Sequence, residues 1–357
     1  MNYFLPLLAS FLVAMGLTPW VRSKAVNWGA VDFPNQRKVH RGVMPRLGGL
    51  AIYLAFIPVA LVSLSFKTPV IGLALGATVI LLLGLLDDTR GLSPRVKLAG
   101  QTLAALAVIP FGVSVDFITN PFNNEILYLG QFAIPLTVFW LVAVTNAVNL
   151  IDGLDGLAGG VSCIASLTMA AVAFTQFKIF GVPGQLEIMT LSLILAASIL
   201  GYLKYNFYPA SIFLGDSGSM LLGFSLGVIS VMGLTKSATA ISVIIPVVVM
   251  GIPLMDTTFA IVRRFMENRP IFQPDREHLH HQLLDCGFSH RQAVLTIYAV
   301  SLLMGASAVA MNIMTTNQAM LLLLILGAII ILTANKVRVT GLKGSYHKQL
   351  PQRSSKL

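Results

Sequence analysis

Charged residues are scarce in this chain: Asp, Glu, Lys and Arg together make up 11% of its 357 residues. Soluble domains carry about 25% charged residues, so the composition excludes a water-soluble fold. Hydrophobic residues make up 56%, and the mean hydropathy is +0.81. No polar stretch is long enough to form a soluble domain, so the composition predicts a single polytopic membrane domain.

The chain also lacks the features of several other protein classes. Its two cysteines, Cys163 and Cys286, lie in an apolar run and in a distant connecting segment, which argues against a disulfide or a cysteine-ligated metal. A Walker A loop, a GxGxxG fingerprint and the HExxH zinc motif do not occur, so any nucleotide must be held by other means. The first apolar run has no basic segment before it, which predicts a retained span rather than a cleaved signal peptide.

About eleven apolar runs are long enough to cross a membrane, taking about 20 residues for each crossing. They predict an all-α transmembrane helical bundle over residues 1–335, followed by a basic tail at 336–357. The runs lie near 3–21, 48–66, 69–86, 96–115, 131–149, 157–177, 188–204, 217–235, 238–262, 293–313 and 318–335.

Basic residues are distributed unevenly between the segments that join these runs. Of the 24 Lys and Arg residues, all but Lys67, Lys178 and Lys236 fall in alternate segments or in the tail. Because the positive-inside rule places Lys and Arg in the cytoplasm, we expect the N-terminus outside and the C-terminus inside. This topology also explains the net charge of +10 without a nucleic-acid partner. The cytoplasmic segments are then 22–47, 87–97, 150–156, 203–216 and 263–292.

Acidic residues and histidines gather on the same predicted side. Of the 14 Asp and Glu residues, only Asp116, Glu125 and Glu187 lie elsewhere, and all six histidines lie on the cytoplasmic side. Asp and Glu contribute little to topology, so their asymmetry needs another cause. A reaction site at the cytoplasmic face would supply that cause.

Two adjacent carboxylates, Asp87 and Asp88, follow the third apolar run. They repel each other unless a cation or a proton lies between them. They either pair with nearby arginines or take part in metal binding or proton transfer, because Mg²⁺ prefers carboxylate and phosphate oxygens. Ser93 and Pro94 are typical of a helix start, which would place Lys97 near the membrane surface and available to a phosphate.

The segment 146–160 carries two asparagines, two aspartates and four glycines between two apolar runs. Asn146 and Asn149, and likewise Asn149 and Asp152, are three residues apart and therefore neighbours on a helix surface. The glycine after each aspartate favours a helix end that presents Asp152 and Asp155 on irregular backbone. Surface turns also place Asp beside Gly, but here the asparagines reach back into the apolar run.

Three other charged residues accompany these segments. Asp216 directly precedes a span and either caps that helix or binds a metal; the other aspartates on this side favour the metal. Asp256 lies about two helical turns inside Arg263, either as a functional group or in a hydrogen bond between helices. Arg46 belongs to a basic segment that either sets the topology or attracts a polyanionic substrate.

The last cytoplasmic segment contains Arg276, His278, His280 and His281. Zinc would require three committed ligands, and the zinc-protease spacing does not occur. Binding of phosphate and handling of protons near neutral pH is the preferred interpretation. A Ser-x-x-Gln capping box that begins at Ser289 predicts the start of the next helix.

Four motifs occur in one order: Asp87-Asp88 with Lys97, NAVNLIDGLDGLAGG at 146–160, FLGDSG at 213–218 and PDREHLHH at 274–281. Together they resemble the polyprenyl-phosphate N-acetylhexosamine-1-phosphate transferases, a family that includes the phospho-MurNAc-pentapeptide translocase. The arginine followed by His-x-His-His is similar to the bacterial undecaprenyl-phosphate GlcNAc-1-phosphate transferases, whereas the translocase branch typically carries three consecutive histidines.

The resemblance implies transfer of GlcNAc-1-phosphate from UDP-GlcNAc to undecaprenyl phosphate, at the cytoplasmic face of the bacterial inner membrane. Mg²⁺ is the implied cofactor, with Mn²⁺ as a substitute. Another UDP-N-acetylhexosamine or UDP-MurNAc-pentapeptide is the alternative donor, and an anion or solute transporter is the alternative class. A UDP-amino sugar and the lipid phosphate are the expected partners; nucleic acid is not expected, and a homodimer stays open.

The resemblance also implies roles for single residues. Asp216 would be the main Mg²⁺ ligand with Asn149 as the second, and Phe213 would stack on uracil with Asp155 near the nucleoside. Asp87 would deprotonate the lipid phosphate, or a carboxylate would attack first and form a covalent intermediate. The candidate catalytic residues are Asp87, Asp88, Asp152, Asp155 and His280; the candidate metal ligands are Asp216 and Asn149, then Asp87 and Asp88; the candidate substrate-binding residues are Lys97, Asn146, Phe213, Arg276, His278, His281 and Arg46.

Overall fold

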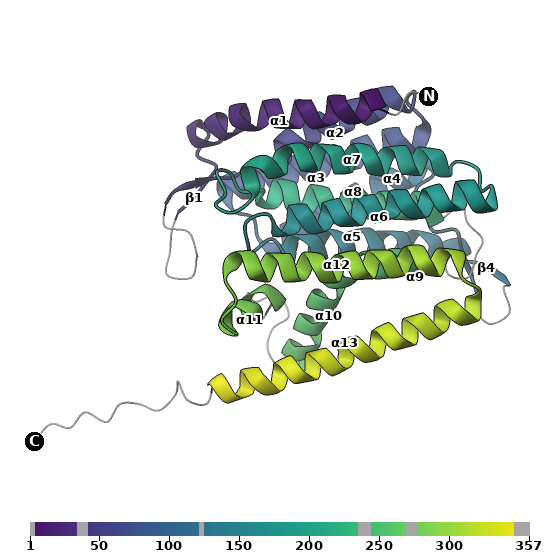
Figure 1. Ribbon diagram of the computed structural model, residues 1–357. Coiled ribbons are helices and arrows are strands. Elements are labelled where there is room, and N and C mark those ends of the chain that lie inside the picture. The colour runs from purple at the N-terminus through teal and green to yellow at the C-terminus, as the bar shows by residue number, and fades with distance from the viewer. Residues whose placement is uncertain are drawn as a thin grey trace, which may run out of the picture.

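Helices form almost all of the regular structure in the computed structural model (Figure 1), which describes residues 4–33, 42–120, 125–234, 244–266, 268 and 278–345. The helices are α1 (Phe4–Asn27), α2 (Gly48–Ser63), α3 (Thr68–Arg90), α4 (Pro94–Val108), η1 (Ile109–Phe111), η2 (Gly130–Phe132), α5 (Ala133–Leu150), α6 (Leu157–Phe180), α7 (Gln185–Asn206), α8 (Gly215–Leu234), α9 (Ile244–Val249), α10 (Gly251–Met266), α11 (Leu279–Asp285), α12 (His290–Ile313) and α13 (Thr316–Ser345). Two antiparallel hairpins join β1 (Val31–Asp32) to β2 (Met44–Pro45), and β3 (Phe117–Thr119) to β4 (Ile126–Tyr128).

The helices agree with the predicted all-α membrane architecture. Within the described residues, seven are long and apolar enough to cross a membrane: α1, α3, α5 together with η2, α6, α7, α8 and α12. The predicted run 238–262 is not one helix where it is described, because a turn at Met250 separates α9 from α10. Pro253 is the third residue of α10, and proline is favoured in the first turn of a helix because its missing N–H has no acceptor to lose there. The predicted number of eleven spans and the outward N-terminus stay predictions.

Several element boundaries differ from those expected. Asp87 and Asp88 lie in the last turn of α3 rather than in a loop, because the helix continues to Arg90 and ends at Gly91, which has a φ of 69°. The helix α13 continues through the predicted tail boundary at 335, and its sequence contains no proline to end it earlier. The short helix α11 was not predicted.

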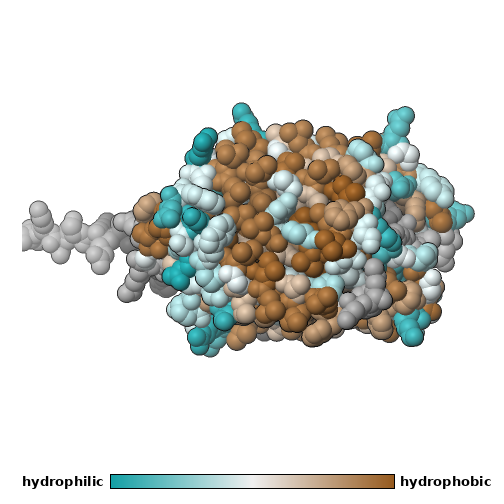
Figure 2. All heavy atoms as spheres, turned by 90° about the horizontal axis from the view of Figure 1, so that it is seen from above, coloured by the Kyte–Doolittle hydropathy of each residue, from teal (hydrophilic) through white to brown (hydrophobic). Residues whose placement is uncertain are grey.

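Large apolar side chains cover the outside of the bundle. Figure 2 shows an apolar band across the middle of the molecule, with hydrophilic residues at both ends. Leu103, Phe139 and Leu303 are 64%, 68% and 66% exposed. A continuous apolar surface of this extent is unfavourable in water and matches the hydrocarbon layer of a membrane.

The helix α8 lies at the centre of the bundle, with 94% of its span buried, and contacts α2, α3, α5, α6 and α7. Glycines allow two of these helices to approach its backbone. A Cβ on Gly49 would lie 2.3 Å from the backbone nitrogen of Gly218, and a Cβ on Gly84 would lie 2.2 Å from the Cα of Ser217. Such small residues allow membrane helices to pack closely. The start of α8 therefore contacts the start of α2 and the end of α3, which places Asp216 beside the end of α3.

The polar groups of interest lie at one end of the bundle, which we call the site end. It includes the end of α3 and the starts of α4 and α8, and in Figure 1 it is the left end, near β1 and α11. The opposite end carries β4 and the ion pair between Lys67 and Glu187.

Candidate active site

A lysine lies between two carboxylates at the site end. The Nζ of Lys97, on α4, is 3.1 Å from Oδ2 of Asp87 on α3 and 2.5 Å from Oδ2 of Asp216 on α8. All three side chains are largely buried. The Lys97 ammonium group therefore offsets the repulsion between Asp87 and Asp216, and not between the adjacent residues Asp87 and Asp88, which were expected to share a cation. We call these three residues the Lys97 cluster.

Asp88 faces away from Lys97 and binds the start of α8. Its Oδ1 accepts a hydrogen bond from the backbone N–H of Asp216 at 2.9 Å, and its Oδ2 accepts one from the N–H of Ser217 at 3.0 Å. The Asp88 side chain is buried, with 6% exposure. Gly215 has a φ of 72°, and a Cβ there would lie 2.5 Å from Oδ2 of Asp88. Asp88 thus caps α8 from a different helix and holds the backbone that carries Asp216.

Asn149 lies against the first turns of α8. Its Nδ2 donates a hydrogen bond to Oγ of Ser219 at 2.8 Å, and Ser219 lies one turn after Asp216. The last turn of α5 therefore contacts the first turn of α8, which carries Asp216 of the Lys97 cluster. This position is compatible with the predicted second ligand role of Asn149.

Asp152 and Arg46 approach the same region from two connecting segments. Asp152 is half-buried in the turn after α5. Desolvation, together with the nearby carboxylates of Asp216 and Asp88, raises the pKa of Asp152 to about 8, against the opposing effect of Arg46. The Asp152 carboxyl group is therefore mostly protonated at pH 7 before any cation binds. Arg46 lies 3.7 Å from Asp32, with which it shares the β1–β2 hairpin.

Asp155 and Phe213 order the segment between α7 and α8. Oδ2 of Asp155 accepts a hydrogen bond from the N–H of Ala210 at 2.9 Å. The N–H of Phe213 donates to Pro45 O at 2.8 Å, and its carbonyl accepts from the N–H of Gly48 at 3.1 Å. The backbone of Phe213 is thereby fixed, and its side chain is half-buried. The predicted roles of both residues toward a nucleoside stay predictions.

Asn146 does not join the Lys97 cluster. Its Nδ2 donates to Oε1 of Gln101 at 2.6 Å and to Val142 O at 2.8 Å, and Nε2 of Gln101 donates back to Oδ1 of Asn146 at 3.3 Å. Gln101 is 2% exposed, so the two amides form a buried contact between α4 and α5. Gln101 was not predicted from sequence, although a single glutamine inside an apolar run is the type of residue that marks a polar contact between helices.

The histidine segment lies at the start of α11. His280 is buried, with its ring centroid 6.0 Å from that of His278 and 4.2 Å from that of His281. Burial and the neighbouring His281 lower the pKa of His280 to about 3. His280 is therefore neutral near pH 7, and its predicted catalytic role stays a prediction. Arg276 lies outside the described residues.

The Lys97 cluster can be tested against the needs of a magnesium ion. Within the parts of the chain that the structure describes, no three His, Cys, Asp or Glu side chains form a metal site on their own. Mg²⁺ is commonly held by one or two carboxylates together with substrate phosphates and water. Asp87 and Asp216 converge on one cation, the Lys97 ammonium, and therefore fit a magnesium ion that arrives with a diphosphate.

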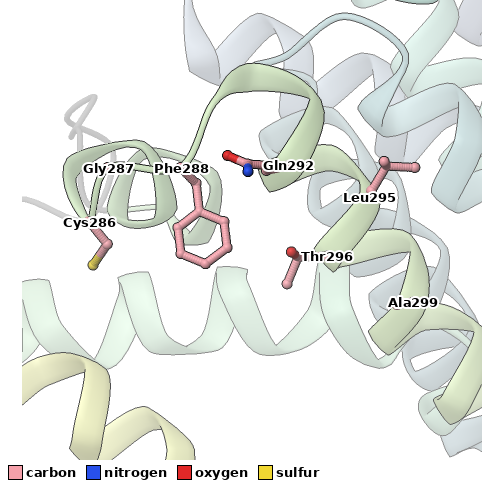
Figure 3. Close-up of a pocket in the computed structure, with 7 residues that line it drawn as sticks. All are labelled: Cys286, Gly287, Phe288, Gln292, Leu295, Thr296 and Ala299. Carbon is pink, nitrogen blue, oxygen red and sulfur yellow. The ribbon is translucent and has the colours of Figure 1, made fainter.

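A separate cavity of about 540 Å³ lies where α11 turns into α12 (Figure 3). Its lining has no charged side chain and contains none of the candidate site residues. The lining residues are Cys286, Gly287, Phe288, Gln292, Leu295, Thr296 and Ala299. This cavity is therefore distinct from the Lys97 cluster.

The fold and the site together define a multi-pass helical membrane protein with carboxylates and a lysine gathered at one end of its bundle. The family described as glycosyl transferase family 4 matches residues 70–234, from α3 to α8. A probable undecaprenyl-phosphate N-acetylglucosaminyl 1-phosphate transferase of Bacillus subtilis (strain 168) is 43% identical, over 94% of this chain and 91% of its own length. The chain therefore belongs to glycosyl transferase family 4, and the predicted resemblance is confirmed.

Other relatives carry similar names. A decaprenyl-phosphate N-acetylglucosaminephosphotransferase of Mycolicibacterium smegmatis is 34% identical, over 82% of this chain and 77% of its own length. An undecaprenyl-phosphate alpha-N-acetylglucosaminyl 1-phosphate transferase of Escherichia coli (strain K12) is 31% identical, over 85% of this chain and 82% of its own length. The similarity therefore extends over most of each protein.

Proposed function

We propose that this protein transfers GlcNAc-1-phosphate from UDP-GlcNAc to undecaprenyl phosphate. An oxygen of the lipid phosphate bonds to the phosphorus that carries the sugar, and the bond from that phosphorus to UMP breaks. UMP leaves with the bonding electrons, and undecaprenyl-diphospho-GlcNAc remains in the membrane as the first lipid-linked intermediate of a cell-surface polysaccharide. The observation that carries this proposal is the Lys97 cluster, in a chain whose relatives are named as transferases of this kind.

The main physical difficulty of this reaction is charge, because an anionic phosphate must approach an anionic diphosphate. The Lys97 ammonium lies where it would offset part of this repulsion. Asp216 and Asp87 would hold Mg²⁺, with Asn149 next to them, and Mn²⁺ would substitute for it. The ion would add positive charge to the diphosphate in the transition state.

Asp88 has a different role in this proposal from the one expected from sequence. Both of its oxygens are hydrogen-bonded to the backbone of α8, so it positions Asp216 rather than acting on the lipid phosphate or the metal. Asp87 has Oδ2 on Lys97 and Oδ1 on the N–H of Leu92 at 2.6 Å. Of the two adjacent carboxylates, only Asp87 therefore faces the cation side of the site.

Two chemical routes fit these residues. In the first, the lipid phosphate attacks directly; in the second, a carboxylate attacks first and gives a covalent phosphosugar–enzyme intermediate. A radiolabelled adduct trapped without lipid would support the second route. Release of UMP only after lipid addition would count against it.

The proposed location is the bacterial inner membrane, with the site end in the cytoplasm, the N-terminus outside and the C-terminus inside. The asymmetric distribution of Lys and Arg supports this orientation. Charged sugar nucleotides do not cross an apolar layer readily, so a site that takes them is best placed on the side where they are made.

Purified protein in detergent tests the proposal directly. With undecaprenyl phosphate and Mg²⁺, it should release UMP from UDP-GlcNAc faster than from other UDP-sugars, and repeated turnover should require the lipid. A faster reaction with UDP-MurNAc-pentapeptide or another UDP-N-acetylhexosamine would reassign the donor. A transporter would release no UMP under any of these conditions, and that result would refute the proposed activity.

A further inference from the structure

Asp256 is a buried acidic residue that lies apart from the Lys97 cluster. It belongs to α10, in an apolar stretch, and is 8% exposed. Burial of an ionisable group in such a place is unfavourable unless it forms hydrogen bonds or ion pairs, so the residues that it contacts indicate its role. From sequence, Asp256 was expected either to act in the reaction or to form a hydrogen bond between two helices.

Both carboxylate oxygens of Asp256 contact the histidine segment. Oδ2 lies 2.8 Å from Nδ1 of His278, and Oδ1 accepts a hydrogen bond from the N–H of Leu279 at 2.8 Å. Leu279 is the first residue of α11, so its N–H has no acceptor within its own helix. Asp256 therefore fixes both the start of α11 and the ring that precedes it.

His280, the residue after Leu279, contacts the loop that holds Asp152. His280 is 3% exposed and packs directly on the backbone there, because a Cβ on Gly153 would lie 2.1 Å from Nε2 of His280. The position of His280 against this loop thus depends on where α11 begins. A displaced α11 would withdraw the ring from the backbone beside Asp152.

We infer that Asp256 is a positioning residue of the transfer reaction, which holds the start of α11 so that His280 packs against the Asp152 loop. This inference rests on the proposed function. Asp256 acts through His278, Leu279 and His280 and does not touch the substrate. Its removal should lower turnover by loosening α11 while the transmembrane bundle stays folded.

Hydrogen exchange tests the anchoring without any assay of activity. In Asp256→Ala, the backbone amides of 279–285 should exchange at least about 10-fold faster than in the wild type, since two hydrogen bonds to a charged group are lost. Asp256→Asn should lie between the two, because the amide oxygen still accepts from Leu279. Thr258→Ala, an exposed position on the same helix, is the matched control and should match the wild type. Unchanged exchange in Asp256→Ala would overturn the inference.

A double-mutant cycle then asks whether Asp256 acts through His280. Asp256→Ala should lower kcat/KM by about 10-fold to 100-fold, mainly through kcat, and Asp256→Asn should restore part of it. In Asp256→Ala/His280→Ala, the loss should be no larger than that of the more severe single variant. Losses that multiply would show that the two residues act independently, and the inference would fail.

A second pair of variants covers the case in which Asp256→Ala does not fold. His278→Asn places an amide N–H where Nδ1 of His278 lies, and this N–H can still donate to Asp256, whereas His278→Gln places its amide at the position of Nε2. His278→Asn should therefore retain at least about 10-fold more activity than His278→Gln. Equal activities would contradict the anchoring role. If the wild type releases no UMP, the proposed function fails while hydrogen exchange still tests the anchor.

Discussion

Replacement of Asp88 tests whether this carboxylate holds α8 or binds a metal. In Asp88→Asn, one oxygen can still accept from α8, but the amide NH₂ meets the second backbone N–H and cannot accept from it. One buried N–H loses its partner, which should lower the free energy of unfolding by about 1–3 kcal/mol. Asp88→Ala leaves both N–H groups without a side-chain acceptor and should lower it by about 2–6 kcal/mol.

The paired variant Asp216→Asn should behave in the opposite way. Its side chain faces Lys97, so we expect most of the activity to be lost, little change in Tm, and partial recovery when Mg²⁺ is raised. Thermal unfolding in detergent and UMP release across a Mg²⁺ series measure both properties for each variant. Asp88→Asn with a wild-type Tm and with activity restored by extra Mg²⁺ would refute the capping role, because a ligand and not a cap would then have been removed.

Three further changes probe the packing and the electrostatics of the site end. Gly84→Ala should lower Tm and activity together, with a loss of about 1–3 kcal/mol in the free energy of unfolding, because its Cβ would meet the α8 backbone. Gly16→Ala, with open space around it, is the control and should have no such effect. Thermal unfolding and UMP release of both variants measure this. Gln101→Leu should destabilise the protein by about 1–3 kcal/mol, because Asn146 loses its side-chain partner and keeps only the carbonyl of Val142. Gln101→Leu/Asn146→Leu should recover most of this loss in thermal unfolding, and no recovery would argue against a purely structural contact. The pKa of Asp152 is about 8 in the folded protein and 3.8 for the free group, so the folded state holds this proton more tightly than the unfolded state. The stability that this proton contributes is present at low pH and is lost as pH rises from about 4 to about 8. Tm measured in this window without Mg²⁺ should therefore fall less steeply in Asp152→Asn than in the wild type, and parallel curves would contradict the raised pKa.

Features encoded within a few consecutive residues were predicted well. Ser93 caps α4 with Pro94 in its first turn, and the capping box at Ser289 opens α12, as expected. Most described residues of the apolar runs fall on helices, because hydropathy and capping depend on local sequence. The break at Met250 was missed, since the run through it is apolar on both sides.

Roles that depend on partners far away in the chain could not be predicted from sequence. Asp88 and the α8 N–H that it accepts from are 128 residues apart, and Asn146 and Gln101 are 45 apart. Two adjacent aspartates look equivalent in sequence, yet their side chains leave α3 in different directions. Asp87 therefore pairs with Lys97, whereas Asp88 accepts hydrogen bonds from the backbone at the start of α8. Likewise, the partner of Asp256 is a segment that joins two helices rather than a helix interior.

The most direct test of the central claim is the release of UMP from UDP-GlcNAc by wild type and Asp216→Asn, with undecaprenyl phosphate present at one ordinary Mg²⁺ concentration. The account predicts lipid-dependent UMP release by the wild type and loss of most of that release in Asp216→Asn, because the carboxylate that meets Lys97 and would hold Mg²⁺ has been removed. Full activity of Asp216→Asn would contradict the assigned site, and no UMP from the wild type would contradict the transferase itself.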